Sequence, residues 1–201
     1  MSQKENLKIF IVEDDIWYGE LLSHHLSLNP AYQIHRFEKA ADCLEKLGLS
    51  PDIICLDISL PDMPGEELLK NIRFTNPETP IIFISGNENI TTAIDLLKQD
   101  NVFDYIVKDD DTKDRLWKSV LNIGKTLALK EEVSHLREEI IKKYDYNNII
   151  IGNSPAIQKV FGMMDKACKT NITVSINGET GTGKELVAKC IHYNSTQQKG
   201  K

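Results

Sequence analysis

Five short apolar runs, each followed by a segment with helical spacing of apolar residues, occupy the first part of this 201-residue chain. Such runs are typical of strands that are buried on both faces of a sheet. The predicted strands are Leu7–Val12, Tyr32–Phe37, Ile53–Ile58, Ile81–Ser85 and Tyr105–Val107. The predicted helices are Ile16–Leu28, Glu38–Leu47, Gly65–Phe74, Ile90–Gln99 and a segment from Asp111–Thr112 through Ile123. This alternation predicts an α/β domain whose parallel sheet is covered by helices on both faces.

The balance of charge changes along the chain. Residues 1–125 carry 13 Lys and Arg against 22 Asp and Glu, a net charge of −9, whereas residues 126–201 carry 11 against 8, a net charge of +3. This difference predicts two structural units. The whole chain has a net charge of −6, which argues against a protein that works mainly by gripping nucleic acid.

Cysteine usage and hydropathy limit the class of protein further. The four cysteines are scattered without a CxxC pair, which predicts a reduced cytoplasmic protein with buried thiols. No run of about 18 apolar residues exists, so we expect no membrane span. The first residues, MSQKENLK, lack the apolar core of a secretory signal.

A helical segment without Pro or Gly connects the two units, from Lys125 to Tyr144. Apolar residues recur there at spacings of four, three and four: Leu129, Val133, Leu136 and Ile140. This segment is either an amphipathic helix that folds onto its own domain or a protruding signalling helix that pairs between subunits. Its length and charge favour the second reading, and hence a homodimer that forms through the receiver and this linker helix.

The second unit begins near Asn147 with a helix-start signal, Asn153-Ser154-Pro155. It predicts a helix over Ala156–Lys169, a strand over Ile172–Ile176 and a helix from Glu185 through His192. A glycine-rich loop lies between the last two, where backbone N–H groups can cradle phosphates while Lys184 reaches the terminal ones. The loop residues are Gly178, Glu179, Thr180, Gly181, Thr182, Gly183, Lys184 and Glu185.

Charged and hydroxyl side chains stand at or just beyond the ends of four predicted strands. They are Glu13, Asp14, Asp57, Ser85 and Lys108. Because ligands bind parallel sheets at the carboxyl ends of the strands, we expect these side chains to meet. Three carboxylates in one place raise one another's pKa unless a cation joins them, and Mg²⁺ prefers such oxygen ligands.

Residues 5–125 resemble the receiver domain of bacterial two-component response regulators. Four motifs in order carry this resemblance: IFIVED, IICLDISLPDMPG, PIIFISG and DYIVK. The resemblance implies a flavodoxin-like, five-stranded doubly wound fold. It also implies that Asp57 accepts a phosphoryl group, that Asp14 binds Mg²⁺ directly and Glu13 mainly through water, and that the backbone carbonyl of Ser59 is a further ligand. Asp15 is expected to be peripheral.

The same resemblance assigns a switch. Ser85 is the hydroxyl that bonds the phosphoryl group, Tyr105 is the aromatic residue that turns inward with it, and Lys108 contacts the phosphoryl oxygens. The chain departs from the receiver pattern after Lys108, because Asp109-Asp110-Asp111 replaces the usual cis proline. We expect this loop to lose a constraint and to add three acids beside the pocket.

The segments GETGTGKELVAKCIH and IIGNSPAIQKV resemble the start of the AAA+ ATPase domain of sigma-54-dependent activators of the NtrC class. In that family Glu follows the loop lysine, as Glu185 does here. The predicted domains are therefore 1–125, a receiver; 126–146, a helical linker; and 147–201, a truncated P-loop AAA+ segment. The other motifs of that ATPase, its sigma-54 loop and its DNA-binding domain are absent from the 201 residues.

We therefore expect a cytoplasmic phosphoacceptor that receives its phosphoryl group from a histidine kinase and controls sigma-54-dependent transcription. Asp57 would catalyse its own phosphorylation with Mg²⁺, and ATP would act only in a complete AAA+ domain, so this chain should have negligible ATPase activity. Contacts with sigma-54 RNA polymerase and DNA would need missing regions. Two alternatives stay open: a nucleotide-binding ATPase module with the P-loop as its functional site, and a stand-alone receiver that acts by protein contact.

Overall fold

The structure, a computed structural model, describes residues 6–86, 98, 102–145 and 149–195. The chain divides into two compact units, Met1–Leu129 and Lys130–Lys201, which are described separately. The division falls inside one helix, so the predicted domain boundaries at 125/126 and 146/147 stay predictions. No helix in the described ranges is long and apolar enough to cross a membrane.

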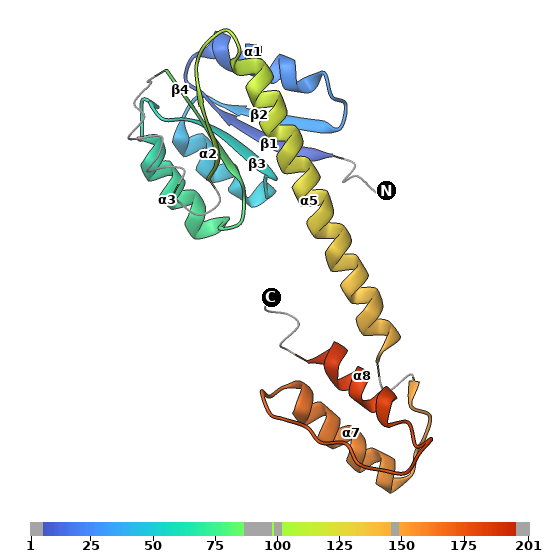
Figure 1. The fold of residues 1–201 in the computed structure, drawn as a ribbon. Helices are drawn as coiled ribbons and strands as arrows, with labels where there is room; N and C mark the ends of the chain where they lie inside the picture. The colour runs from blue at the N-terminus through green and yellow to red at the C-terminus, as the bar shows by residue number, and fades with distance from the viewer. Residues whose placement is uncertain (1–5, 87–97, 99–101, 146–148, 196–201) are drawn as a thin grey trace. The chain divides into compact units, whose positions relative to one another are not determined.

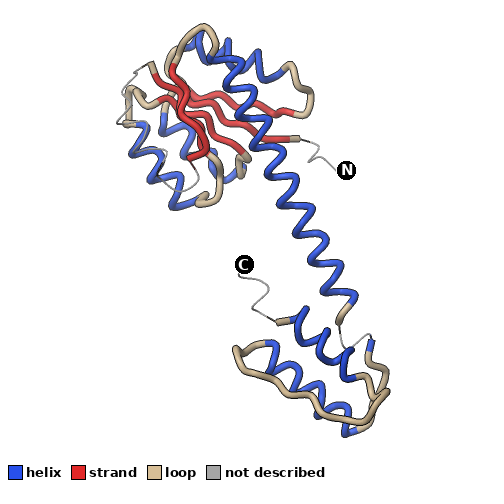
Figure 2. Tube along the Cα trace, viewed as in Figure 1, coloured by secondary structure: helices blue, strands red, loops and turns tan. Residues whose placement is uncertain are grey.

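The first unit is an α/β domain with a five-stranded parallel sheet in the order β2-β1-β3-β4-β5 (Figures 1 and 2). The strands are β1 (Leu7–Val12), β2 (Tyr32–Phe37), β3 (Ile53–Asp57), β4 (Ile81–Ser85) and β5 (Val102–Val107). The helices are α1 (Ile16–Ser27), α2 (Ala40–Lys46), the short 3-10 helix η1 (Leu47–Leu49), α3 (Gly65–Thr75) and α5 (Thr112–Lys143). The predicted fold class is therefore confirmed. The predicted helix Ile90–Gln99 lies, apart from Lys98, outside the described residues.

Alternate residues of each central strand face opposite cores, as the pleat of a strand requires. On one face Phe10, Ile54 and Phe83 pack against α2 and α3. On the other face Ile9 and Ile53 pack against α1 and α5. Because all these side chains are at most 1% exposed, the central strands are buried on both sides, which explains why they read as continuous apolar runs.

Helix α5 continues without a break far beyond the residues that cover the sheet. Its first half buries Leu116, Val120 and Ile123. Its second half carries the predicted apolar seam in exposed positions: Leu129 is 61%, Val133 47%, Leu136 49% and Ile140 39% exposed. The predicted continuity of this helix is confirmed, and the seam is an uncovered apolar stripe on the described chain.

The second unit contains two packed helices, α7 (Pro155–Cys168) and α8 (Lys184–Asn194). The prediction of a strand over Ile172–Ile176 is wrong, because these residues form no ladder with any described strand. A strand makes its ladder of backbone hydrogen bonds only with a neighbouring strand. Without one, Ile172 is 62% and Val174 41% exposed.

Candidate functional site

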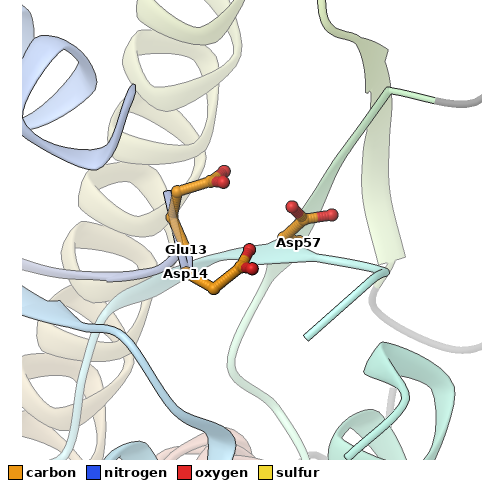
Figure 3. A group of neighbouring side chains, drawn as sticks. All are labelled: Glu13, Asp14 and Asp57. Atoms are coloured by element: carbon orange, nitrogen blue, oxygen red, sulfur yellow. The ribbon is translucent and has the colours of Figure 1, made fainter. Parts of the chain in front are cut away.

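Three carboxylates meet at the carboxyl end of the sheet. Glu13 and Asp14 directly follow β1, and Asp57 is the last residue of β3, the neighbouring strand. One oxygen from each of the three lies within 4.8 Å of the others (Figure 3). Their position is the point where the strand order reverses, at which open α/β sheets bind ligands.

Lys108, one residue after β5, bridges two of these carboxylates. Its Nζ lies 2.7 Å from Glu13 Oε1 and 2.7 Å from Asp57 Oδ2. Glu13 is 2% and Asp57 5% exposed, whereas Asp14 is exposed. Such charge-assisted bonds are shorter and stronger than neutral ones, so Lys108 fixes both buried acids in one place.

Burial sets the electrostatics of this cluster. Desolvation raises the pKa of Glu13 from 4.5 to about 7, because the lowering effect of Lys108 is weaker and the charge of Asp57 adds to the rise. Burial alone would lower the pKa of Lys108, but its bonds to Asp57 and Glu13 outweigh that effect and raise it. The lysine is therefore a fixed positive charge beside carboxylates that repel one another.

The carboxylate oxygens of this cluster are suitable ligands for a hard divalent cation. Glu13 Oε2 is buried and has no hydrogen-bond partner among the residues that the structure describes, although Glu13 Oε1 is bound by Lys108. An unsatisfied buried carboxylate oxygen is costly, and a cation would satisfy it. The exposed carboxylate of Asp14 and an oxygen of Asp57 lie within reach of the same cation. All these ligands are oxygens, which fits Mg²⁺.

The segment that follows β3 orients the carboxylate of Asp57. The backbone N–H of Ser59 donates to Asp57 Oδ1 at 3.0 Å, so the two oxygens of Asp57 have different partners. Gly65, the first residue of α3, lies against this segment. A Cβ there would be 2.7 Å from the carbonyl oxygen of Asp57 and 2.8 Å from the Cα of Ile58, so only glycine fits.

The two predicted switch residues lie on β4 and β5. Ser85 is 1% exposed, and its carbonyl accepts a bond from the N–H of Lys108 at 2.8 Å. This bond ties the end of β4 to the lysine of the cluster. Tyr105 is half-buried and packs against the core on the α2–α3 face.

Sequence reasoning missed Tyr18, which lies in the first turn of α1. The ammonium of Lys108 lies 4.7 Å from the centre of the Tyr18 ring, within the range of a cation–π contact. Asp15, expected to be peripheral, places this turn: its Oδ1 accepts a bond from the N–H of Tyr18 at 3.0 Å and caps α1. No spacing in the sequence indicates this contact, because Tyr18 and Lys108 lie on elements that are far apart in the chain.

Of the three acids that follow Lys108, Asp109 is bound at the start of α5. The carboxylate of Asp109 pairs with Arg115 and accepts a bond from the N–H of Asp111 at 2.9 Å. The N–H of Asp109 donates to Thr112 Oγ1 at 2.7 Å, a bond that proline could not make. Asp109 therefore belongs to the start of α5, and these bonds replace the constraint that a proline would supply.

The glycine-rich loop closes around one of its own carbonyl groups. The carbonyl of Glu179 accepts bonds from Thr182 Oγ1 at 2.8 Å and from Lys184 Nζ. Gly181 and Gly183 have φ of +85° and +84°, where side chains are strained. Glu185 is exposed and pairs with Lys189. The side-chain donors of Thr182 and Lys184 thus point into the loop.

Known families match both parts of the chain. Residues 9–120 match the response regulator receiver domain, and residues 150–201 match the sigma-54 interaction domain. The transcriptional regulator NtrC of Proteus hauseri is 34% identical over 96% of this chain and 39% of its own length. The regulatory protein AtoC of Escherichia coli is 31% identical over 96% of this chain and 41% of its own. The chain therefore spans about two fifths of the length of these relatives.

Solved structures are also similar to this chain. The crystal structure of NtrX from Brucella abortus in complex with ADP is similar with a TM-score of 0.58 and 30% identity. The match covers 98% of this chain and 42% of NtrX. NtrX in complex with ATP matches with a TM-score of 0.57 and the same identity, over 96% and 42%.

Proposed function

We propose, because this chain belongs to the response regulator receiver family, that it is a signalling switch that accepts a phosphoryl group on Asp57. The observation that carries this proposal is the setting of Asp57. Its carboxylate is buried at the end of an apolar strand, bound to Lys108 and adjacent to Glu13 and Asp14. Burying two carboxylates, Glu13 and Asp57, next to a third is costly. Such costly clusters of charged groups are typical of functional sites, and a phosphoryl-transfer site accounts for this one.

The chemistry follows from the positions of these groups. A carboxylate oxygen of Asp57 attacks the phosphorus of a phosphohistidine on a kinase, and the P–N bond breaks with its electron pair leaving on the imidazole. Glu13, Asp14, Asp57 and the Ser59 carbonyl would hold Mg²⁺, which supplies positive charge next to the phosphoryl oxygens when bound. Lys108 supplies a second positive charge, and the hydroxyl of Ser85 supplies a hydrogen bond to the product.

The substitution Asp57→Asn tests this function. Incubation with acetyl phosphate and Mg²⁺ should add one phosphoryl group to the wild-type chain and none to the variant, because an amide oxygen is not an adequate nucleophile. Intact-protein mass spectrometry gives the result. Asp42→Asn, an exposed acid on α2, is the matched control and should be labelled normally. Equal labelling of Asp57→Asn would refute the assignment.

We also propose that the glycine-rich loop binds a nucleotide and that the whole protein acts on sigma-54 RNA polymerase. The match to the sigma-54 interaction domain and the nucleotide complexes of NtrX support this. Binding of phosphate would exchange the Glu179 carbonyl for phosphate oxygens as the partner of Lys184. Lys184→Ala should abolish binding of a fluorescent ADP analogue, whereas Lys189→Ala on the same helix should leave it intact.

The exposed seam of α5 supports a homodimer. Its four apolar residues have the spacing of the contact positions in a coiled coil, and pairing with a second copy would bury them. Leu136→Lys should shift the chain from dimer to monomer in size-exclusion chromatography with light scattering. The exposed, non-seam substitution Glu138→Lys should leave the dimer unchanged, and a dimer that survives Leu136→Lys would argue against the seam.

A further inference from the structure

The carboxylate of Asp62 binds two backbone amides that are distant in the sequence. The N–H of Ala40 donates to Asp62 Oδ1 at 3.0 Å, and the N–H of Ala41 donates to Asp62 Oδ2 at 3.0 Å. These bonds lower the pKa of Asp62, with the bond from Ala41 contributing most. Asp62 belongs to the segment between β3 and α3, whereas both alanines open α2.

The residue that precedes α2 provides no side-chain acceptor for the first backbone amides of this helix. The first amides of a helix have no intrahelical acceptor, and a Ser, Thr, Asp or Asn at the N-cap usually accepts from them. The N-cap residue of α2 is Lys39, which makes no side-chain capping bond. Lys39 has the extended backbone of an N-cap, with φ −133° and ψ 148°, but its side chain has no acceptor. Asp62 therefore supplies the cap from another part of the chain.

The same bonds hold the segment that adjoins Asp57. Residues 58–64 start at the phosphoacceptor strand and include Ser59, whose carbonyl is a proposed Mg²⁺ ligand. The near end is fixed by the bond from Ser59 N–H to Asp57 and by the core residue Leu60, which is 8% exposed. Beyond Leu60, Asp62 connects the segment to α2 through two charge-assisted bonds.

We propose that Asp62 is a positioning residue, which holds the 58–64 segment so that the Ser59 carbonyl stays in place as a ligand for Mg²⁺. This inference rests on the proposed function. Asp62 itself is exposed and is not part of the carboxylate cluster. It acts through the segment that it tethers, as groups behind metal ligands commonly do. The first turn of α2 is thereby connected to the phosphorylation site.

The test separates two effects of Asp62: the attachment of the 58–64 segment to α2, here called the tether, and the capping of the first amides of α2. In the full chain, Asp62→Ala removes both, and Asp62→Ala with Lys39→Ser restores a cap on α2 but not the tether. We expect calorimetric titration with MgCl₂ to show a loss of affinity of about tenfold in Asp62→Ala, the lower range for groups behind a metal ligand. The double variant should keep this loss while recovering the thermal midpoint. Lys39→Ser alone should bind Mg²⁺ like the wild type.

Each outcome has one meaning. Recovery of Mg²⁺ affinity in the double variant would show that Asp62 only caps α2, and this would overturn the inference. Unchanged affinity in Asp62→Ala would overturn it as well. Failure of the wild-type chain to bind Mg²⁺ would instead refute the proposed function, on which the inference depends. Hydrogen exchange at the backbone amides of Ser59, Leu60 and Met63 should quicken in both Asp62→Ala variants and shows independently whether the tether is lost.

Discussion

The receiver unit and the P-loop segment carry similar apolar runs, but among the described residues these runs form strands only in the receiver. In the receiver, Ile54 on β3 pairs with Phe10 on one side and Ile81 on the other, and it is completely buried. In the P-loop segment, the run Ile172–Ile176 has no described strand beside it, and Ile172 is 62% exposed. The same kind of sequence therefore gives different structures, depending on what lies next to it.

Helices do not show this difference between the two regions. Both α1 and α7 form where their sequences predict them, and each has a side-chain cap at its start, Asp15 and Ser154 respectively. A helix satisfies its backbone groups within one segment, whereas a strand needs a partner. Local signals therefore predict helices in both regions, and strands only where the neighbouring strands are present.

The largest expected difference concerns the removal of a large apolar side chain. Ile54→Ala should lower the free energy of unfolding of the receiver by about 2–5 kcal/mol, because it leaves a cavity in a packed core. Ile172→Ala should change stability by less than about 0.5 kcal/mol, since the side chain is mostly exposed. The effect of Ile54→Ala is measured by urea denaturation, followed by the fluorescence of Trp117, which packs on the receiver core.

Hydrogen exchange at the amides of α7 and α8 measures the effect of Ile172→Ala on the second unit. Ile54→Val, which removes one methylene, is the control at the same position. It should cost only about 0.5–1.5 kcal/mol, because it leaves a smaller cavity. A large loss of protection in Ile172→Ala would mean that this run is buried in solution, and the contrast between the two regions would disappear.

Most of the fold could be predicted from the sequence, because the strands of the receiver are buried on both faces and read as unbroken apolar runs. The sequence places the ends of strands less accurately. β5 begins at Val102, three residues before its predicted start, because Asp104 interrupts the apolar run while still pairing with Ile82 of β4. A register shift between Ile81 and Ile82 leaves Phe103 without a partner in the pairing. Pairing with a neighbour extends a strand beyond the residues that its own composition would favour.

The candidate site shows the same limit. Glu13, Asp14, Asp57 and Lys108 could be predicted to meet, since each stands at or just beyond a strand end and parallel strands bring those ends together. Tyr18 and the bonds of Asp62 could not be predicted, because they depend on where a helix face and a loop come to rest in three dimensions. Such contacts across elements leave no fixed spacing in the sequence.

A smaller effect is expected for an added methyl group at two glycines. Gly65→Ala should destabilise the receiver by about 1–3 kcal/mol and weaken Mg²⁺ binding, because the new Cβ would overlap the backbone of Asp57 and Ile58. Gly162→Ala in α7 should instead stabilise its helix by about 0.5–1 kcal/mol, since no atom of the described residues lies within 4 Å of a Cβ added there. Thermal unfolding measures the loss of stability in Gly65→Ala, and hydrogen exchange in α7 measures the gain in Gly162→Ala. A gain of stability in Gly65→Ala as well would contradict the close packing at Gly65.

The smallest effects should be the same in both regions, because they arise from local bonds. The N–H of Tyr18 donates to Asp15 at 3.0 Å, and the N–H of Ile157 donates to Ser154 at 3.3 Å. Asp15→Ala and Ser154→Ala should each cost about 1 kcal/mol, seen as faster hydrogen exchange in the first turns of α1 and α7. Asp15→Asn and Ser154→Thr retain an acceptor and should cost less. A much larger loss in α1 than in α7 would show that sheet packing, rather than the capping bond, decides whether these helices begin where their sequences place them.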